Sequence, residues 1–255
     1  MRVTVLGQSA SNGTGLADQS QAWPWLTKAA LEERTGEPLE LTHVSVVANG
    51  PRAVEYAMGK VEASNPDLVI LVVGSYLCAV ALVSEQVRHR FGARAHRWYV
   101  ALERRFDRRT RPSGGTPGRT NSLARRIVRR VIGARPYATV EEVAGCYEEM
   151  LRRLASREGM QVVVFMEPSW PAWVDAENKG AIAAWSGVVP RAKAAADTHH
   201  FPWAESNPLF ATAPDRDALY MPDGVHKTIE GHRYQANALI PVLLDPANGL
   251  VSARP

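Results

Sequence analysis

The sequence predicts an α/β fold, a three-layer α/β/α sandwich around a mainly parallel central sheet. Short runs rich in valine, isoleucine and leucine alternate along the chain with longer segments of helical character, which is typical of parallel strands joined by helices. The 255 residues are 45% hydrophobic, so the core is large enough to be stable without disulfides or metals. We therefore expect a single domain over residues 1–255, with ligands bound beyond the carboxyl ends of the strands.

The predicted elements follow one another in the order that this fold requires. We expect strands at residues 2–7, 39–47, 68–73 and 161–166, and a short fifth strand between 197 and 222. We expect helices at residues 21–35, 52–63, 139–157, 179–196 and 228–240. Gly36 and Gly159 are predicted to end the helices that precede them, and Pro241 to kink or end the last one.

Between about residues 84 and 135 this alternation stops, and the sequence predicts an Arg-rich helical insertion or lid. Basic helices are expected at 83–107 and 122–132, joined by a flexible loop at 111–118. The arginines of this segment are Arg88, Arg90, Arg94, Arg97, Arg104, Arg105, Arg108, Arg109, Arg111, Arg119, Arg125, Arg126, Arg129 and Arg130. The net charge of the whole chain is only +4, so the positive charge is concentrated here.

Two interpretations of the basic insertion remain open. It is either a solvated lid over the site or a surface that recognises an anionic or lipid-like substrate. Nucleic acid is not an expected partner, because few aromatic residues are interleaved with the arginines and no nucleic-acid-binding motif is present.

The remaining bulk features predict a cytoplasmic protein. Cys78 and Cys146 form no CxxC motif, so we expect two reduced, buried thiols. The first residues run directly into a predicted strand, without the pattern of a signal peptide. The longest uncharged run, residues 68–84, is interrupted by Gly74 and Ser75 and is shorter than the ~20 residues of a transmembrane helix.

An acid and an imidazole three residues apart, Asp223 and His226, stand on a glycine-containing turn near the end of the chain. The carboxylate of Asp223 could hold the Nδ1–H group of His226 and leave Nε2 free as a base. Alone, such a pair is more often a surface turn. The first predicted strand, however, is followed by Gly7-Gln8-Ser9, and Ser9 would supply a nucleophile for this base.

Other kinds of site fit the sequence less well. The glycines after the first strand do not form G-x-G-x-x-G, and no Gly-Lys-Ser/Thr follows them, so neither a dinucleotide site nor a P-loop is expected. His199 and His200, with Asp197 nearby, do not favour a metal site, because adjacent histidine rings converge poorly and no further ligands cluster there. No metal or organic cofactor is predicted.

A serine after the first strand, combined with Asp-x-x-His near the carboxyl terminus, resembles the SGNH (GDSL) hydrolase family. Gly7-Gln8-Ser9 is similar to the family's first block, Asn49-Gly50 to its second, and Asp223-Gly224-Val225-His226 closely to its fifth. The resemblance implies a flavodoxin-like sheet and a GDSL-type esterase or lipase. Its expected catalytic residues are Ser9, His226 and Asp223, and the N–H groups of Ser9 and Gly50 are expected to hold the oxyanion.

The chain departs from the family pattern in two blocks. Gln8 replaces the aspartate of the first block, and Gly74-Ser75-Tyr76-Leu77 replaces the Gly-x-Asn-Asp of the third, so that Tyr76 occupies the place of an oxyanion-binding asparagine. Loss of one such donor costs about 10²–10³ in rate unless another group replaces it. The hydroxyl groups of Tyr76 and Ser75 and the amide of Asn49 are the candidates.

The prediction is therefore a serine hydrolase that cleaves a small-molecule acyl ester through an acyl-enzyme intermediate. Trp170 and Trp173, just after the fourth strand, are expected to contact the substrate. Two alternatives stay open: an acyltransferase that uses the same site, and a binding protein of weak or no activity that keeps the fold.

Overall fold

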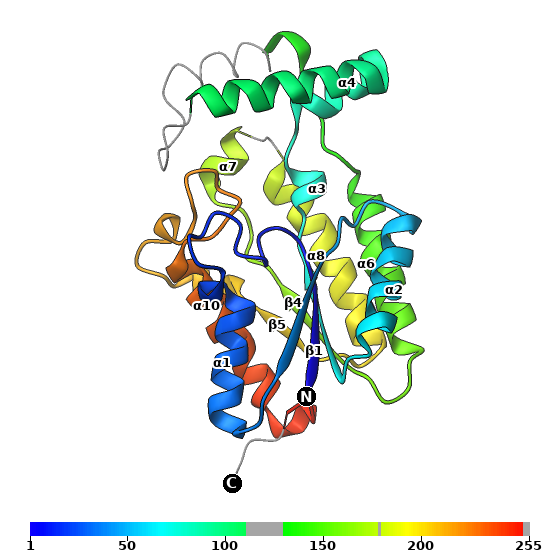
Figure 1. Ribbon diagram of the computed structural model, residues 1–255, viewed down its shortest axis with the longest axis vertical. Coiled ribbons are helices and arrows are strands. Elements are labelled where there is room, and N and C mark those ends of the chain that lie inside the picture. Colours follow the sequence, from blue (N-terminus) through cyan, green and yellow to red (C-terminus); the bar gives the residue numbers. More distant parts are fainter. Residues whose placement is uncertain (111–129, 178–179, 252–255) are drawn as a thin grey trace.

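The protein, seen here in a computed structural model, is built on a five-stranded sheet in the order β2-β1-β3-β4-β5 (Figure 1). The structure describes residues 1–110, 130–177 and 180–251. Every neighbouring pair of strands is parallel, which confirms the α/β prediction and gives the flavodoxin-like strand order. The strands are β1 Arg2–Gly7, β2 Glu40–Ser45, β3 Leu68–Val73, β4 Gln161–Met166 and β5 Trp203–Glu205.

Helices cover both faces of this sheet and make the three predicted layers (Figure 1). On one face α1 packs against α10, and on the other α6 packs against α2 and α8. The large helices are α1 Trp23–Thr35, α2 Pro51–Ser64, α6 Val140–Ala155, α8 Ala181–Thr198 and α10 Ile229–Leu244. Short helices α3 Tyr76–Ala79, α7 Ala172–Glu177 and α9 Asn207–Ala211 lie in the connections, with 3₁₀ turns at Gln19–Gln21, Asp217–Leu219 and Pro246–Asn248.

The central strand β3 explains why the sheet forms where it does. All six of its residues, LVILVV, are buried, as expected for a strand that is covered by helices on both faces. Its neighbours in space are β1 and β4, although β4 lies about ninety residues further along the chain; Leu71 is in register with Leu6 on one side and with Val164 on the other. The carboxyl ends of these strands therefore meet at one edge of the sheet.

One predicted helix end is wrong, and Pro241 does not end the last helix. Gly36 does end α1 in the left-handed conformation. The helix α6, however, ends at Ala155 with Ser156 as its C-cap, and Gly159 (φ 72°) belongs to the turn before β4. Pro241 lies inside α10, which continues to Leu244. The fully buried side chains of Leu239 and Leu243 hold α10 on the sheet on both sides of this proline, so packing outweighs the lost backbone hydrogen bond.

The basic insertion begins with α4, Val83–Thr110, a helix broken at Gly92 (φ 80°, ψ 179°). It lies beyond the carboxyl ends of the strands, at the top of Figure 1. A two-residue antiparallel bridge between Leu82 and Arg135 joins the two ends of the insertion. The predicted loop at 111–118 and most of the predicted helix at 122–132 lie outside the described residues. No described helix combines the length and the apolar character that a membrane span requires.

Candidate active site

The loop after β1 presents Ser9 at the carboxyl edge of the sheet. Gly7 packs so closely on Ser11 that a Cβ atom at this position would collide with the serine side chain. Ser11 in turn is fixed by two contacts: its Oγ donates to the carbonyl oxygen of Gln8 at 2.7 Å and hydrogen-bonds with Nε2 of His43 at 2.8 Å. The turn is thus held from inside the protein, while the Ser9 side chain is exposed.

A tight loop before α10 brings Asp223 and His226 to the same edge. The N–H of Met221 donates to the carbonyl oxygen of His226 at 2.8 Å and closes this loop. Gly224, with φ 67°, packs against Trp173 and Val174 so tightly that no Cβ atom would fit. A glycine is therefore required between the acid and the imidazole.

Asp223, His226 and Ser9 form a chain of polar contacts. The Oδ2 atom of Asp223 lies 2.7 Å from Nδ1 of His226, and Nε2 of His226 lies 3.4 Å from Oγ of Ser9. The first contact places the imidazole proton on Nδ1 and leaves Nε2 as an acceptor toward the serine. A separation of 3.4 Å is long for a hydrogen bond but usual for a catalytic contact without substrate.

The Asp223 carboxylate is stabilised as an anion. Burial on its own would raise its pKa, but the His226 side chain and the backbone N–H groups of His226 and Val225 donate hydrogen bonds to it and lower the pKa to about 2. The carboxylate is thus ionised at neutral pH and can orient the imidazole and balance a positive charge on it.

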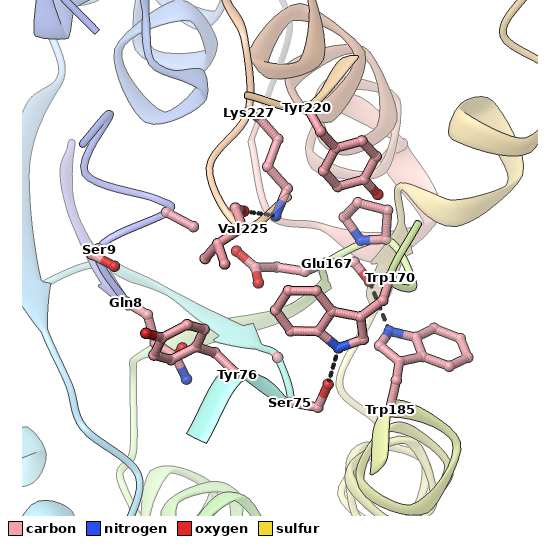
Figure 2. A pocket seen from close by; sticks show the side chains of 13 residues that line it. Gln8, Ser9, Ser75, Tyr76, Glu167, Trp170, Trp185, Tyr220, Val225 and Lys227 are labelled. Atoms are coloured by element: carbon pink, nitrogen blue, oxygen red, sulfur yellow. Dashed lines mark hydrogen bonds between the residues drawn. The ribbon is translucent and has the colours of Figure 1, made fainter. Parts of the chain in front are cut away.

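A small pocket opens beside Ser9 and is drawn in Figure 2. Its cavity volume is about 10 Å³, which is room for one water-sized group. The side chains and glycine that line it come from the ends of β1, β3 and β4, from α8 and from the loop before α10: Gln8, Ser9, Ala10, Gly74, Ser75, Tyr76, Glu167, Pro168, Trp170, Trp185, Tyr220, Val225 and Lys227. His226 and Asp223 do not line it.

Tyr76, which stands in the place of the family's asparagine, lines this pocket. Figure 2 shows its hydroxyl pointing toward the side on which Gln8 and Ser9 lie. Burial raises the pKa of Tyr76, and so does the nearby Asp223 carboxylate, so the phenol keeps its proton and can act as a donor. Ser75 also lines the pocket, and its Oγ accepts a hydrogen bond from Nε1 of Trp170 at 2.8 Å.

Two of the residues predicted to bind the oxyanion are not among those that line the pocket. The N–H of Gly50 donates to Sγ of Cys146 at 2.9 Å, so this donor already has an acceptor, and neither Gly50 nor Asn49 lines the cavity. By contrast, the N–H of Ser9 donates no hydrogen bond within the described part of the chain. Of the two tryptophans predicted as substrate contacts, Trp170 lines the pocket, whereas Trp173 packs against Gly224.

The unusual Gln8 has a partner that the sequence did not reveal. Its Nε2 donates to the hydroxyl of Tyr147 at 3.2 Å. The same hydroxyl accepts a hydrogen bond from the N–H of Gly74 and donates one to its carbonyl oxygen, both at 3.2 Å. Tyr147, which is 2% exposed, therefore ties the loop after β1 to the loop after β3. A glutamine suits this position because it can donate to a phenol oxygen.

No functional role was predicted for several other residues of the pocket. Glu167 directly follows β4, so its place at the strand edge was a usable signal, as was the position of Lys227 next to His226. Trp185 on α8 and Tyr220 carried no such signal. His199 and His200 do not lie in a metal-ligand cluster, and within the described residues no group of three or more His, Cys, Asp or Glu side chains gathers around a metal position.

Solved structures of known proteins share this architecture. No family model and no curated protein matches the sequence. A lipase/acylhydrolase from Enterococcus faecalis superposes with a TM-score of 0.61 at 14% identity, covering 100% of both chains. The acetylxylan esterase Axe2 from Geobacillus stearothermophilus gives 0.58 at 11% identity, covering 99% of this chain and 97% of that one. An extracellular lipase from Streptomyces rimosus gives 0.51 at 18%, covering 95% and 97%. The chain has the fold of the SGNH/GDSL hydrolases.

Proposed function

We propose that this protein is a serine hydrolase that cleaves a carboxylic ester through an acyl-enzyme intermediate. The observation that carries the proposal is the contact chain from Asp223 through His226 to Ser9, with separations of 2.7 and 3.4 Å, at the carboxyl edge of a parallel sheet. This is the relation between acid, base and nucleophile that acyl transfer requires. The esterases and lipases of the same fold agree with it.

In the proposed reaction, Ser9 Oγ attacks the ester carbonyl carbon while its proton passes to Nε2 of His226. The tetrahedral intermediate collapses as the C–O bond to the alcohol breaks, and the imidazolium returns that proton to the leaving oxygen. Water then attacks the acyl-enzyme with His226 again as base, and releases the acid and free Ser9. Asp223 holds the tautomer and balances the imidazolium charge.

The developing oxyanion would be held by the N–H of Ser9 and the hydroxyl of Tyr76. The first is a backbone donor that makes no hydrogen bond within the described residues, and the second is a protonated phenol that lines the pocket beside Ser9. Tyr76 would take the place of the third-block asparagine. Gly50 is not needed for this step.

The exposed face of α4 supports an anionic substrate. Arg94, Arg97 and Arg105 are exposed on it, together with Phe91 (63%) and Trp98 (69%). On the same helix, Glu85 is buried and within ion-pair distance of Arg88 and His96. We propose that this surface attracts the alcohol portion of an anionic, lipid-like ester toward the site.

The proposal is tested with the nucleophile and the base. Ser9→Ala and His226→Ala should each lower kcat on an activated short-chain ester by at least about 10³-fold, with unchanged circular dichroism. A fluorophosphonate probe should label the wild-type protein on Ser9, as located by mass spectrometry, and should not label either variant. Full activity of Ser9→Ala would refute the mechanism. Asp223→Asn should retain more activity than Ser9→Ala, or a comparable amount where it inverts the imidazole tautomer.

A further inference from the structure

Two buried side chains of opposite charge line the pocket and have no part in the proposed reaction. Glu167 is 8% exposed and Lys227 is 4% exposed. Figure 2 shows the Glu167 carboxylate in the middle of the pocket, between Val225 and Trp170, with Lys227 on the same side as Val225. Buried charges are costly unless something satisfies them, so their presence beside a nucleophile requires an explanation.

Glu167 is held in place by its backbone, but one oxygen of its carboxylate has no hydrogen-bond partner among the described residues. Its N–H donates to the carbonyl oxygen of Val73 at 3.0 Å, and its own carbonyl oxygen accepts from Nε1 of Trp185 at 3.2 Å. A Cβ atom on Gly74 would come within 2.7 Å of Oε2, so the glycine makes room for the carboxylate. The Oε1 atom is buried and has no hydrogen-bond partner within the described residues.

Lys227 has spare donors. Its Nζ donates one hydrogen bond, to the carbonyl oxygen of Val225 at 3.1 Å, and lies 5.5 Å from the centre of the Tyr220 ring. No ion pair joins it to Glu167 in the described part of the chain, although both line the same cavity. An ammonium group has three donor hydrogens, so Lys227 can also donate to a bound ligand.

The pocket lies on the acyl side of the nucleophile. The leaving alcohol must sit against the imidazole that protonates it, and neither His226 nor Asp223 lines the cavity. The portion of the substrate that enters the pocket is therefore the acyl group. With room for about one water-sized group, the cavity fits a small substituent on the acyl carbon.

We infer that the pocket selects a short acyl group that carries a hydroxyl, as in a 2-hydroxyacyl ester. A hydroxyl can donate to Oε1 of Glu167 and accept from Nζ of Lys227, so one neutral group would satisfy both buried charges. A substrate ammonium would also bind a carboxylate, but Lys227 beside it would repel a second positive charge. A methyl group would leave Glu167 without a partner. This inference rests on the proposed function, because it assigns the acyl group of the same reaction.

The experiment compares ethyl esters of glycolate, methoxyacetate, acetate and glycine. Methoxyacetate has a similar inductive effect to glycolate but no donor, and each kcat/KM is divided by the rate of alkaline hydrolysis of that ester. The wild type should prefer glycolate over methoxyacetate and over acetate by about 10-fold or more. Glu167→Leu should bring this ratio close to 1, and Glu167→Gln, which keeps an acceptor, should give an intermediate ratio. Glu205→Gln, an exposed acid at the end of β5, is the control and should leave the ratio unchanged.

Binding without turnover separates this inference from the proposed function. In Ser9→Ala, saturation-transfer NMR should detect ethyl glycolate and not ethyl methoxyacetate, and adding Glu167→Leu should remove the signal. Three results would overturn the inference. The wild type could hydrolyse the esters without preferring glycolate, the preference for glycolate could survive in Glu167→Leu, or the wild type could prefer the glycine ester. Selective binding of glycolate to Ser9→Ala, without hydrolysis by the wild type, would support the pocket assignment and refute the reaction.

Discussion

Replacing Tyr147 with phenylalanine removes one oxygen atom that three groups share. The hydroxyl makes three hydrogen bonds of 3.2 Å, two with Gly74 and one with Gln8, in a position where burial also raises the pKa of the phenol. Each buried hydrogen bond contributes about 0.5–1.5 kcal/mol net, and an unsatisfied buried partner costs about 1–3 kcal/mol. We therefore expect Tyr147→Phe to lower the free energy of unfolding by about 2–4 kcal/mol.

The same substitution should affect turnover, because both partners of the hydroxyl flank the site. Gln8 precedes the nucleophile and Gly74 precedes Ser75 and Tyr76, so a loosened Tyr147 contact would shift the two loops relative to each other. A displacement of about 1 Å costs up to 10²-fold in rate. We expect kcat to fall by about 10-fold or more, with KM changed by less than about 2-fold, which identifies Tyr147 as a positioning residue.

Urea denaturation measures the stability change, and steady-state kinetics on a short activated ester measures the rate. Tyr234→Phe is the matched control, because the ring of Tyr234 packs edge-on against Phe210 and the substitution keeps this ring. This variant should lose less than about 1 kcal/mol of unfolding free energy and no activity. Gln8→Leu completes a double-mutant cycle, and its effect should be smaller in the Tyr147→Phe background. A stability loss below about 1 kcal/mol, or additive effects in the cycle, would show that the hydroxyl does not join the loops.

Three other predictions address the oxyanion, the charged surface and pH. Tyr76→Phe should lower kcat by about 10-fold or more with little change in KM, whereas Asn49→Ala should behave as wild type; equal kinetics for both variants would remove Tyr76 from the oxyanion site. Hydrolysis of an anionic ester should fall steeply between low salt and ~0.1 M, where screening acts within ~10 Å, while a neutral ester should respond little. Replacing Arg94, Arg97 and Arg105 with glutamine should reproduce the effect of salt on the anionic ester. If the two esters had identical salt profiles, α4 would have no role in recognising an anionic substrate and would be only a solvated lid. Burial, with help from Lys227 and His226, lowers the pKa of His232 to about 3, against about 6.5 in an unfolded chain. Between these two pKa values the unfolded state binds more protons than the folded state. The stability that neutral His232 contributes is therefore complete above about pH 6.5 and is lost as the pH falls toward 3, by up to ~1.4 kcal/mol per pH unit. Urea denaturation at pH 7, 6 and 5 measures this. The free energy of unfolding should depend less steeply on pH in His232→Gln than in the wild type, and an equal dependence on pH would contradict this account.

The strands could be predicted because their sequences leave few choices. The run 68–73 is wholly apolar and short, and such a run fits a strand buried on both faces. Pro241 shows the limit of local rules, since a proline usually ends a helix, but here the helix is held on both sides by buried leucines. A single sequence does not show how strongly tertiary packing will favour one local conformation.

The polar contacts of the site were predictable where they follow from a tight turn or from the strand order. The distance from Asp223 to His226 follows from a tight turn, and strand order brings Ser9 to the same edge. The acceptor of the Gly50 N–H is 96 residues away, on α6, and nothing near Gly50 indicates it. Trp170 lines the pocket and Trp173 does not, because Trp173 lies on α7, a short helix that was not predicted from the sequence.

The span of chain between Ser9 and His226, the proposed nucleophile and base, has a consequence for when the proposed activity could begin during synthesis. Ser9 and His226 are 217 residues apart, and β1, which presents Ser9, lies between β2 and β3 in the sheet. At about 5–20 residues per second, roughly 11–43 s pass between translation of the serine and of its base. Throughout that interval the nascent chain holds an unactivated serine. Reactivity would begin only once the C-terminal helix docks on α1, so unfinished and C-terminally truncated chains should be inert.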